Sequence, residues 1–135
     1  MKLMLDTDYC VDLIRNRALR NRIFPWLSKH EAGELGISVI TLAELEYGVQ
    51  NSSNQERNKE ALDKFLLPLE IADFDAAAAA RYGEIRASLE KSGKQIGSLD
   101  MLIGASALSI GAPLVTNNVR EFKRIKGLEI QQPDL

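Results

Sequence analysis

The stretch Leu3-Met4-Leu5-Asp6-Thr7-Asp8 is the most informative part of the chain, because an apolar run passes there into an acid and then into a helical pattern. The same succession recurs twice. Glu44 follows the apolar run 37–41, and Asp100 follows Ile96-Gly97-Ser98. In an open α/β fold, the carboxyl ends of strands and the amino ends of helices meet at one edge of the sheet, where ligands bind. We therefore expect these three acids to converge.

Apolar runs and helical patterns alternate along the rest of the chain. The further strands are predicted near 37–40, 69–71, 114–116 and 128–130, and the helices over 8–16, 18–31, 41–50, 55–66, 76–91, 98–110 and 119–123. Asp75 and Ser98 are predicted to cap the helices at 76–91 and 98–110. This alternation predicts a three-layer α/β/α fold with a central, mainly parallel sheet of four or five strands. Neither a linker nor an internal repeat interrupts the chain, so residues 1–135 are expected to form one domain.

Composition narrows the class of protein. The chain has 135 residues, of which 45% are hydrophobic, and a net charge of −2 with a pI of about 5.5. No apolar run approaches the roughly 20 residues that a membrane span requires. The single cysteine, Cys10, cannot form an intrachain disulfide, so a reducing cytoplasm is the expected compartment. The mild acidity means that any nucleic-acid binding depends on local basic patches.

Each acid also has a purely structural interpretation. Asp6 is a good helix N-cap, Thr41-x-x-Glu44 is a capping-box pattern, and Asp100 suits the first turn of a helix. Carboxylates that crowd together, however, raise one another's pKa and destabilise the fold unless a cation neutralises them. An all-oxygen cluster suits Mg²⁺, for which Mn²⁺ can substitute. From the residues alone, both the helix-capping roles and a shared metal site remain open for these acids.

Two polar residues follow the strand at 114–116 to the same edge. Thr116 is able to orient a carboxylate by hydrogen bonding, and Asn118 offers a neutral oxygen, although both also fit an ordinary turn. The only histidine, His30, is expected inside a helix, remote from the acids, so a histidine-rich zinc site is excluded. A metal held by Asp6, Asp100 and Glu44 would activate water for phosphodiester hydrolysis, with no nucleophilic side chain.

These motifs together resemble the PIN-domain ribonucleases of the VapC toxin family. The first acid, the run 38–48 around Glu44, the run 96–103 around Asp100 and the closing segment 114–118 match that family in order and spacing. The resemblance covers nearly the whole chain.

The resemblance implies a metal-dependent endoribonuclease with Asp6, Glu44 and Asp100 as its acidic core. It further implies a homodimer, inhibition by a cognate VapB-type antitoxin, and contact with operator DNA only through that antitoxin. The implied substrate is structured RNA, such as a transfer RNA or a ribosomal RNA loop. Two positions depart from the family pattern. Asn118 stands where many members have a fourth acid, and Asp8 stands where asparagine is commoner. Asp8 either adds charge to the pocket or caps the first helix, and capping is the favoured expectation.

Basic side chains near the acids are candidates for RNA contact. They are Arg86, Lys94, Arg120, Lys123 and Arg124. They would hold phosphates beside the site and offset the acidic overall charge. A solvated basic face explains the same residues equally well.

Two rival functions remain at the level of sequence. Asp6-Thr7-Asp8 resembles the motif of haloacid-dehalogenase-like phosphatases, in which Asp6 would be the nucleophile and Asp8 the general acid. That scheme gives Glu44 no role. The second rival is a catalytically silent PIN scaffold, for which the missing fourth acid at Asn118 is the main argument.

Overall fold

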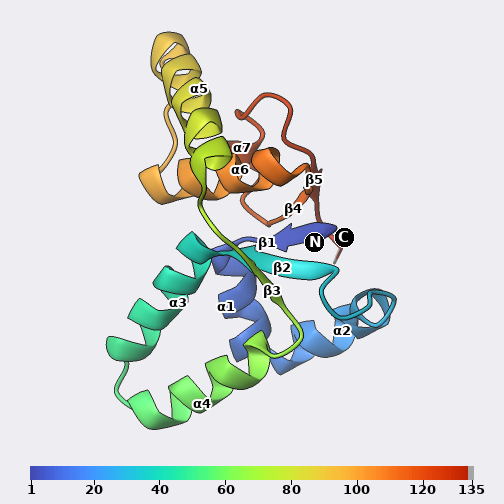
Figure 1. The fold of residues 1–135 in the computed structure, drawn as a ribbon. Helices are drawn as coiled ribbons and strands as arrows, with labels where there is room; N and C mark the ends of the chain where they lie inside the picture. Colours follow the sequence, from blue (N-terminus) through green and yellow to red (C-terminus); the bar gives the residue numbers. More distant parts are fainter. Residues whose placement is uncertain (134–135) are drawn as a thin grey trace.

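The computed structural model describes residues 1–133, and its centre is a five-stranded sheet (Figure 1). The strands are β1 (Leu3–Leu5), β2 (Leu35–Ser38), β3 (Glu70–Ala72), β4 (Leu114–Val115) and β5 (Ile130–Gln131). They lie in the order β3-β2-β1-β4-β5, and every neighbouring pair is parallel. All carboxyl ends therefore point to one edge, with the first strand in the middle of the sheet.

Helices cover both faces of the sheet (Figure 1). They are α1 (Thr7–Arg15), α2 (Arg17–Leu27), α3 (Val39–Gln50), α4 (Gln55–Leu66), α5 (Ala76–Ser92), α6 (Ser98–Ile110) and α7 (Val119–Phe122). The first four lie on one face, and α5, α6 and α7 lie on the other. The predicted three-layer α/β/α arrangement is thus confirmed, with five strands.

Side-chain alternation along β1 divides the interior into two cores. Leu3 and Leu5 point to the face covered by α1 to α4, and Met4 points to the face covered by α5 and α6. All three are buried, as expected for a central parallel strand with helices on both sides. The strand is therefore fixed from both faces, and so is the acid that follows it.

The second strand ends earlier than the sequence indicated. Val39 and Ile40 were expected to continue the strand, but they form the first turn of α3. The reason is a cap: the side chain of Ser38 accepts a hydrogen bond from the backbone N–H of Thr41 at 3.0 Å. With Ser38 as the N-cap, the helix starts at Val39, two residues before the predicted start at Thr41.

Other boundaries differ too. Helix α2 ends at Leu27 rather than residue 31, where the Ser28 hydroxyl donates to the carbonyl of Pro25 at 3.1 Å, so His30 lies beyond the helix. Strands β3 and β5 each begin one or two residues later than predicted. Asp75 caps α5, as expected, by accepting the N–H of Ala78 at 3.0 Å.

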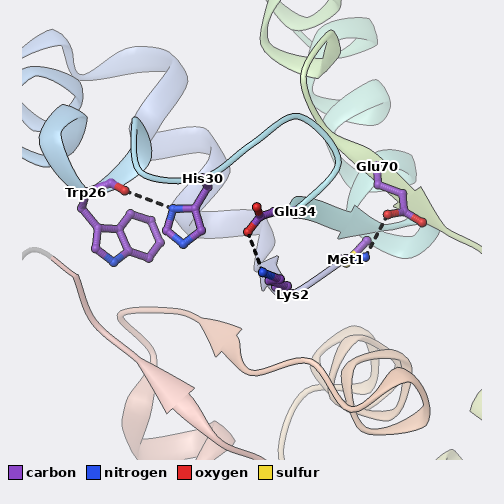
Figure 2. A network of polar contacts seen from close by, with 6 residues as sticks. All are labelled: Met1, Lys2, Trp26, His30, Glu34 and Glu70. Atoms are coloured by element: carbon purple, nitrogen blue, oxygen red, sulfur yellow. Dashed lines mark hydrogen bonds and ion pairs between the residues drawn. The ribbon is translucent and has the colours of Figure 1, made fainter.

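Polar contacts at the amino-terminal edge of the sheet are of an ordinary structural kind (Figure 2). Lys2, which precedes β1, pairs with Glu34 at 3.4 Å. His30 Nδ1 lies 3.0 Å from the carbonyl oxygen of Trp26, and the two rings are in contact. Within residues 1–133, no helix is long and apolar enough to cross a membrane.

Candidate active site

Asp6 occupies the junction between β1 and α1, and both oxygens of its carboxylate are engaged. Oδ1 accepts the backbone N–H of Tyr9 at 2.8 Å, which makes Asp6 the N-cap of α1. Oδ2 accepts the hydroxyl of Thr116, the residue that follows β4. The side chain is only 4% exposed, and this burial raises its pKa to about 6 despite both hydrogen bonds. The structural and the functional interpretations of Asp6 therefore coexist.

Glu44 lies on α3, one turn beyond the cap. The capping-box interpretation is wrong, because the N–H of Thr41 bonds to Ser38 and not to this carboxylate. Instead, Glu44 Oε1 accepts a hydrogen bond from the hydroxyl of Thr7 on α1 at 2.7 Å. Since a threonine at the start of α1 holds Glu44 toward the end of β1, the carboxylate is aimed at the edge where Asp6 lies.

Asp100 lies in the first turn of α6, which begins after Gly97. Ser98 was expected to cap this helix, but it is the first helical residue, and the cap position makes no side-chain hydrogen bond. The pKa of Asp100 is raised to about 6, by burial first and then by the negative charges of Glu121, Asp6, Glu44 and Asp8. Its carboxylate is therefore close enough to these four acids for their negative charges to raise its pKa.

Glu121 is the acid that sequence reasoning missed. It lies in α7, and its Oε2 accepts a hydrogen bond from the side-chain amide of Asn118 at 3.2 Å. Among the charged neighbours of Asp100, it is the strongest in raising the pKa. An acidic side chain therefore lies close to Asn118, the position at which many family members have a fourth acid. The sequence feature that could have identified Glu121 is its position, three residues after Asn118 in the segment that follows β4.

The acids share one concave pocket of about 350 Å³. Its lining residues are Asp6, Thr7, Asp8, Glu44, Gly97, Ser98, Leu99 and Asp100. Asp8 was expected to cap α1, but Asp6 performs that function and Asp8 is an exposed acid on the pocket wall. The structure therefore brings the three predicted acids together and adds a fourth, Asp8, to the lining.

Thr116 and Asn118 are placed differently from each other. The Thr116 hydroxyl donates to Asp6 and its oxygen accepts the backbone N–H of Asn118 at 2.9 Å. The side chain of Asn118 is turned to Glu121 and does not line the pocket. Thr116 thus orients Asp6, whereas Asn118 orients Glu121.

The donor set fits a hard divalent cation held by few protein ligands. Among the described residues, no three acidic, histidine or cysteine side chains are close enough to form a complete metal cage. Mg²⁺ does not need one, because it is usually bound through one or two carboxylates, several waters and substrate phosphates. The pKa values of Asp6 and Asp100 are both about 6, which shows that the ionised carboxylates are destabilised at this edge. A bound divalent cation would offset that destabilisation.

The candidate RNA-contacting side chains do not converge on the pocket. Arg86 donates to Glu90 at 2.9 Å and to the hydroxyl of Tyr82 at 3.2 Å. Arg124 donates to the carbonyl of Gln95 at 2.9 Å and lines a different cavity, between α5 and the segment that follows α7. The remaining three are exposed: Lys94, Arg120 and Lys123.

Comparison with known proteins identifies the family. The PIN domain model matches residues 3–128. The chain is 44% identical over 136 residues to "Ribonuclease VapC2" of Rickettsia felis, covering 99% of each chain, and 39% identical over 133 residues to "tRNA(fMet)-specific endonuclease VapC" of Shigella flexneri, covering 97% of each. A crystal structure of VapBC2 from Rickettsia felis bound to a promoter DNA fragment superposes with a TM-score of 0.88 at 43% identity, over 97% of this chain and 98% of that one. The chain therefore belongs to the PIN domain family and, within it, to the VapC ribonucleases.

Proposed function

We propose that this chain is the toxin of a type II toxin–antitoxin pair and acts as a metal-dependent endoribonuclease. The observation that carries the proposal is the pocket in which Asp6, Glu44 and Asp100 meet, with Glu121 close to Asp100. The names of the relatives support RNA cleavage as the activity. These acids come from four separate segments of the chain, and like charges brought together in this way destabilise the fold unless a cation neutralises them.

In this proposal Asp6 and Asp100 hold Mg²⁺, or Mn²⁺ in its place. When bound, the ion lowers the pKa of a water molecule and offsets the negative charge of the scissile phosphodiester. Thr116 keeps the Asp6 carboxylate in one orientation, because its hydroxyl occupies Oδ2. Glu44 completes the ligand set or orients the attacking water from the α3 side. Hydrolysis then needs no covalent intermediate with the protein.

The proposed substrate is structured RNA, with a transfer RNA or a ribosomal RNA loop as the expected class. Initiator transfer RNA is the first candidate, because a relative with 39% identity is named for it. Exposed cations on the α6 and α7 side of the sheet, including Lys94, Arg120 and Lys123, are available for phosphates. They would compensate for the net charge of −2.

The proposed inhibitor is a VapB-type antitoxin. An apolar groove of about 130 Å³ between α1, α3 and α4 borders the acid pocket, and Glu44 lines both. Its apolar lining includes Val11, Ile14, Leu45 and Val49, which suits one face of an amphipathic helix. The structural relatives from Rickettsia felis and Salmonella typhimurium are VapBC complexes bound to DNA. For this chain we propose operator binding only through the antitoxin, and a homodimer of the toxin.

The two rival functions are weaker than this proposal. The phosphatase scheme gives Glu44 no role, although Glu44 lines the acid pocket, and the family is not that of the phosphatases. The silent scaffold rested on the absence of a fourth acid at Asn118. Glu121 places a carboxylate three residues later, with its charge acting on Asp100, which counts against that argument.

The test is cleavage of total cellular RNA by the purified, partner-free protein with Mg²⁺ or Mn²⁺. We expect discrete fragments that EDTA abolishes. Asp6→Asn should abolish cleavage, whereas Asp8→Asn should reduce it only partly, because Asp8 is exposed on the pocket wall. Asp63→Asn, at an exposed acid on α4, is the matched control and should cleave normally. Equal loss in Asp6→Asn and Asp8→Asn would favour the phosphatase scheme, and no cleavage by the wild type would favour the scaffold.

A further inference from the structure

A chain of three hydroxyl groups leads from the start of α3 to Glu44. The hydroxyl of Thr7 lies 2.7 Å from Glu44 Oε1 and 3.1 Å from the hydroxyl of Thr41. The hydroxyl of Thr41 in turn lies 3.4 Å from that of Ser38. Ser38 and Thr41 are completely buried. The chain therefore connects the end of β2, through the first residue of α1, to a carboxylate on α3.

The direction of these hydrogen bonds follows from the number of protons. Each hydroxyl has one proton to donate, and an ionised carboxylate only accepts. Thr7 therefore donates to Glu44, Thr41 donates to Thr7, and Ser38 donates to Thr41. The distances shorten from 3.4 through 3.1 to 2.7 Å toward the carboxylate, as expected where a charge polarises successive hydroxyl groups.

Glu44 needs such a restraint because it borders two cavities. It lines the acid pocket and also the apolar groove between α1, α3 and α4. A glutamate side chain has several rotatable bonds, so an unrestrained carboxylate would sample both directions. The hydroxyl of Thr7, which itself lines the acid pocket, holds Oε1 on that side.

We propose that Thr7, supported by Ser38 and Thr41, is a positioning residue that directs Glu44 into the acid pocket and away from the groove. This inference rests on the proposed metal-dependent activity of that pocket. The distribution of threonine in the chain agrees with it. The chain has three threonines, at positions 7, 41 and 116, and all three donate hydrogen bonds within the networks that hold Asp6 or Glu44.

Thr7→Val tests the proposal, because it removes the hydroxyl and keeps the shape of the side chain. Thr7→Ser keeps the hydroxyl and loses a methyl group. Ser109→Ala is the control, since the Ser109 hydroxyl donates to a carbonyl near the end of α6, outside the pocket lining. The measurements are Mn²⁺ affinity by calorimetry on the full chain, Tm without metal, and RNA cleavage as a function of Mn²⁺ concentration.

Hydrogen bonds to charged groups are strong enough that we expect Thr7→Val to weaken Mn²⁺ binding and raise the half-saturating Mn²⁺ concentration by about tenfold. At saturating Mn²⁺, KM for RNA should stay within about twofold, and Tm should stay within about 3 °C. Thr7→Ser should restore wild-type Mn²⁺ affinity, and Ser109→Ala should not change it.

Each outcome decides a different point. Wild-type Mn²⁺ affinity in Thr7→Val overturns the inference, and so does equal weakening in Thr7→Ser, which would show that only side-chain volume matters. If the wild type binds Mn²⁺ but cleaves no RNA, the proposed nuclease activity is wrong, while the Mn²⁺ affinities still decide the role of Thr7. If the wild type binds no Mn²⁺, both are overturned.

Discussion

Replacing Asp100 with asparagine should stabilise the metal-free protein at neutral pH. Its pKa is raised from the ordinary 3.8 to about 6, because the carboxyl group is partly buried among other acids. Two units correspond to at most about 3 kcal/mol, and solvent screening of a half-buried side chain reduces this to about 1–2 kcal/mol. Asparagine keeps the shape and removes the charge, so the penalty disappears.

The sign of the pH dependence follows from the same shift. Since the folded protein binds this proton more tightly than the unfolded chain, the carboxyl group costs stability as pH rises from about 4 through 6. Asp6 has a pKa raised to about 6 as well and contributes in the same direction. In EDTA, the wild type should therefore lose stability between about pH 4 and pH 6.5 more steeply than Asp100→Asn.

The assay is urea denaturation of the wild type and Asp100→Asn in EDTA at pH 7.5 and at pH 4. We expect the variant to be more stable at pH 7.5 by about 1–2 kcal/mol, and the difference to shrink to about 0.5 kcal/mol or less at pH 4, where the folded carboxyl group is protonated. Adding Mg²⁺ at pH 7.5 should stabilise the wild type alone. Equal stability at pH 7.5, or a difference that persists undiminished at pH 4, would refute the reasoning.

Two further predictions concern Glu121 in α7 and Gly36 in β2. Glu121→Gln removes the charge that, among the neighbouring acids, contributes most to raising the pKa of Asp100. In an NMR titration of the Asp100 carboxyl carbon, the pKa should therefore fall part of the way toward 3.8, because burial still raises it; an unchanged pKa would contradict the assigned cause. Gly36→Ala should cost about 2–3 kcal/mol in urea denaturation, because its Cβ would lie 2.5 Å from the backbone oxygen of Glu70 on the neighbouring strand; a loss near zero would show that β2 and β3 separate easily.

The convergence of the acids was predictable from sequence because it depends on one general rule. Parallel strands place their carboxyl ends together, and Asp6, Glu44 and Asp100 each follow a strand or open a helix there. What was not predictable was which groups hold them. The Thr7 to Glu44 hydrogen bond joins residues 37 positions apart and depends on the packing of α1 against α3.

Most of the remaining wrong predictions arose where two nearby residues both suit the N-cap of the same helix. Ser38 and Thr41 both suit an N-cap, and the sequence pattern favoured Thr41 because Glu44 lies three residues later. The structure uses Ser38, which frees Glu44 for the pocket. Similarly, Asp6 and Asp8 both suit the cap of α1, and the choice of Asp6 leaves Asp8 exposed on the pocket wall. Glu121 was missed because its effect depends on how α7 packs beside α6.

The most direct test of the acid pocket as a reaction centre is cleavage of purified initiator transfer RNA by the wild type and Asp100→Asn at saturating Mg²⁺. We predict a single set of fragments from the wild type, and none from the variant, although the variant is folded and more stable without metal. Cleavage by Asp100→Asn at the wild-type rate would contradict the account, because this carboxylate of the pocket lining would then have no part in the reaction.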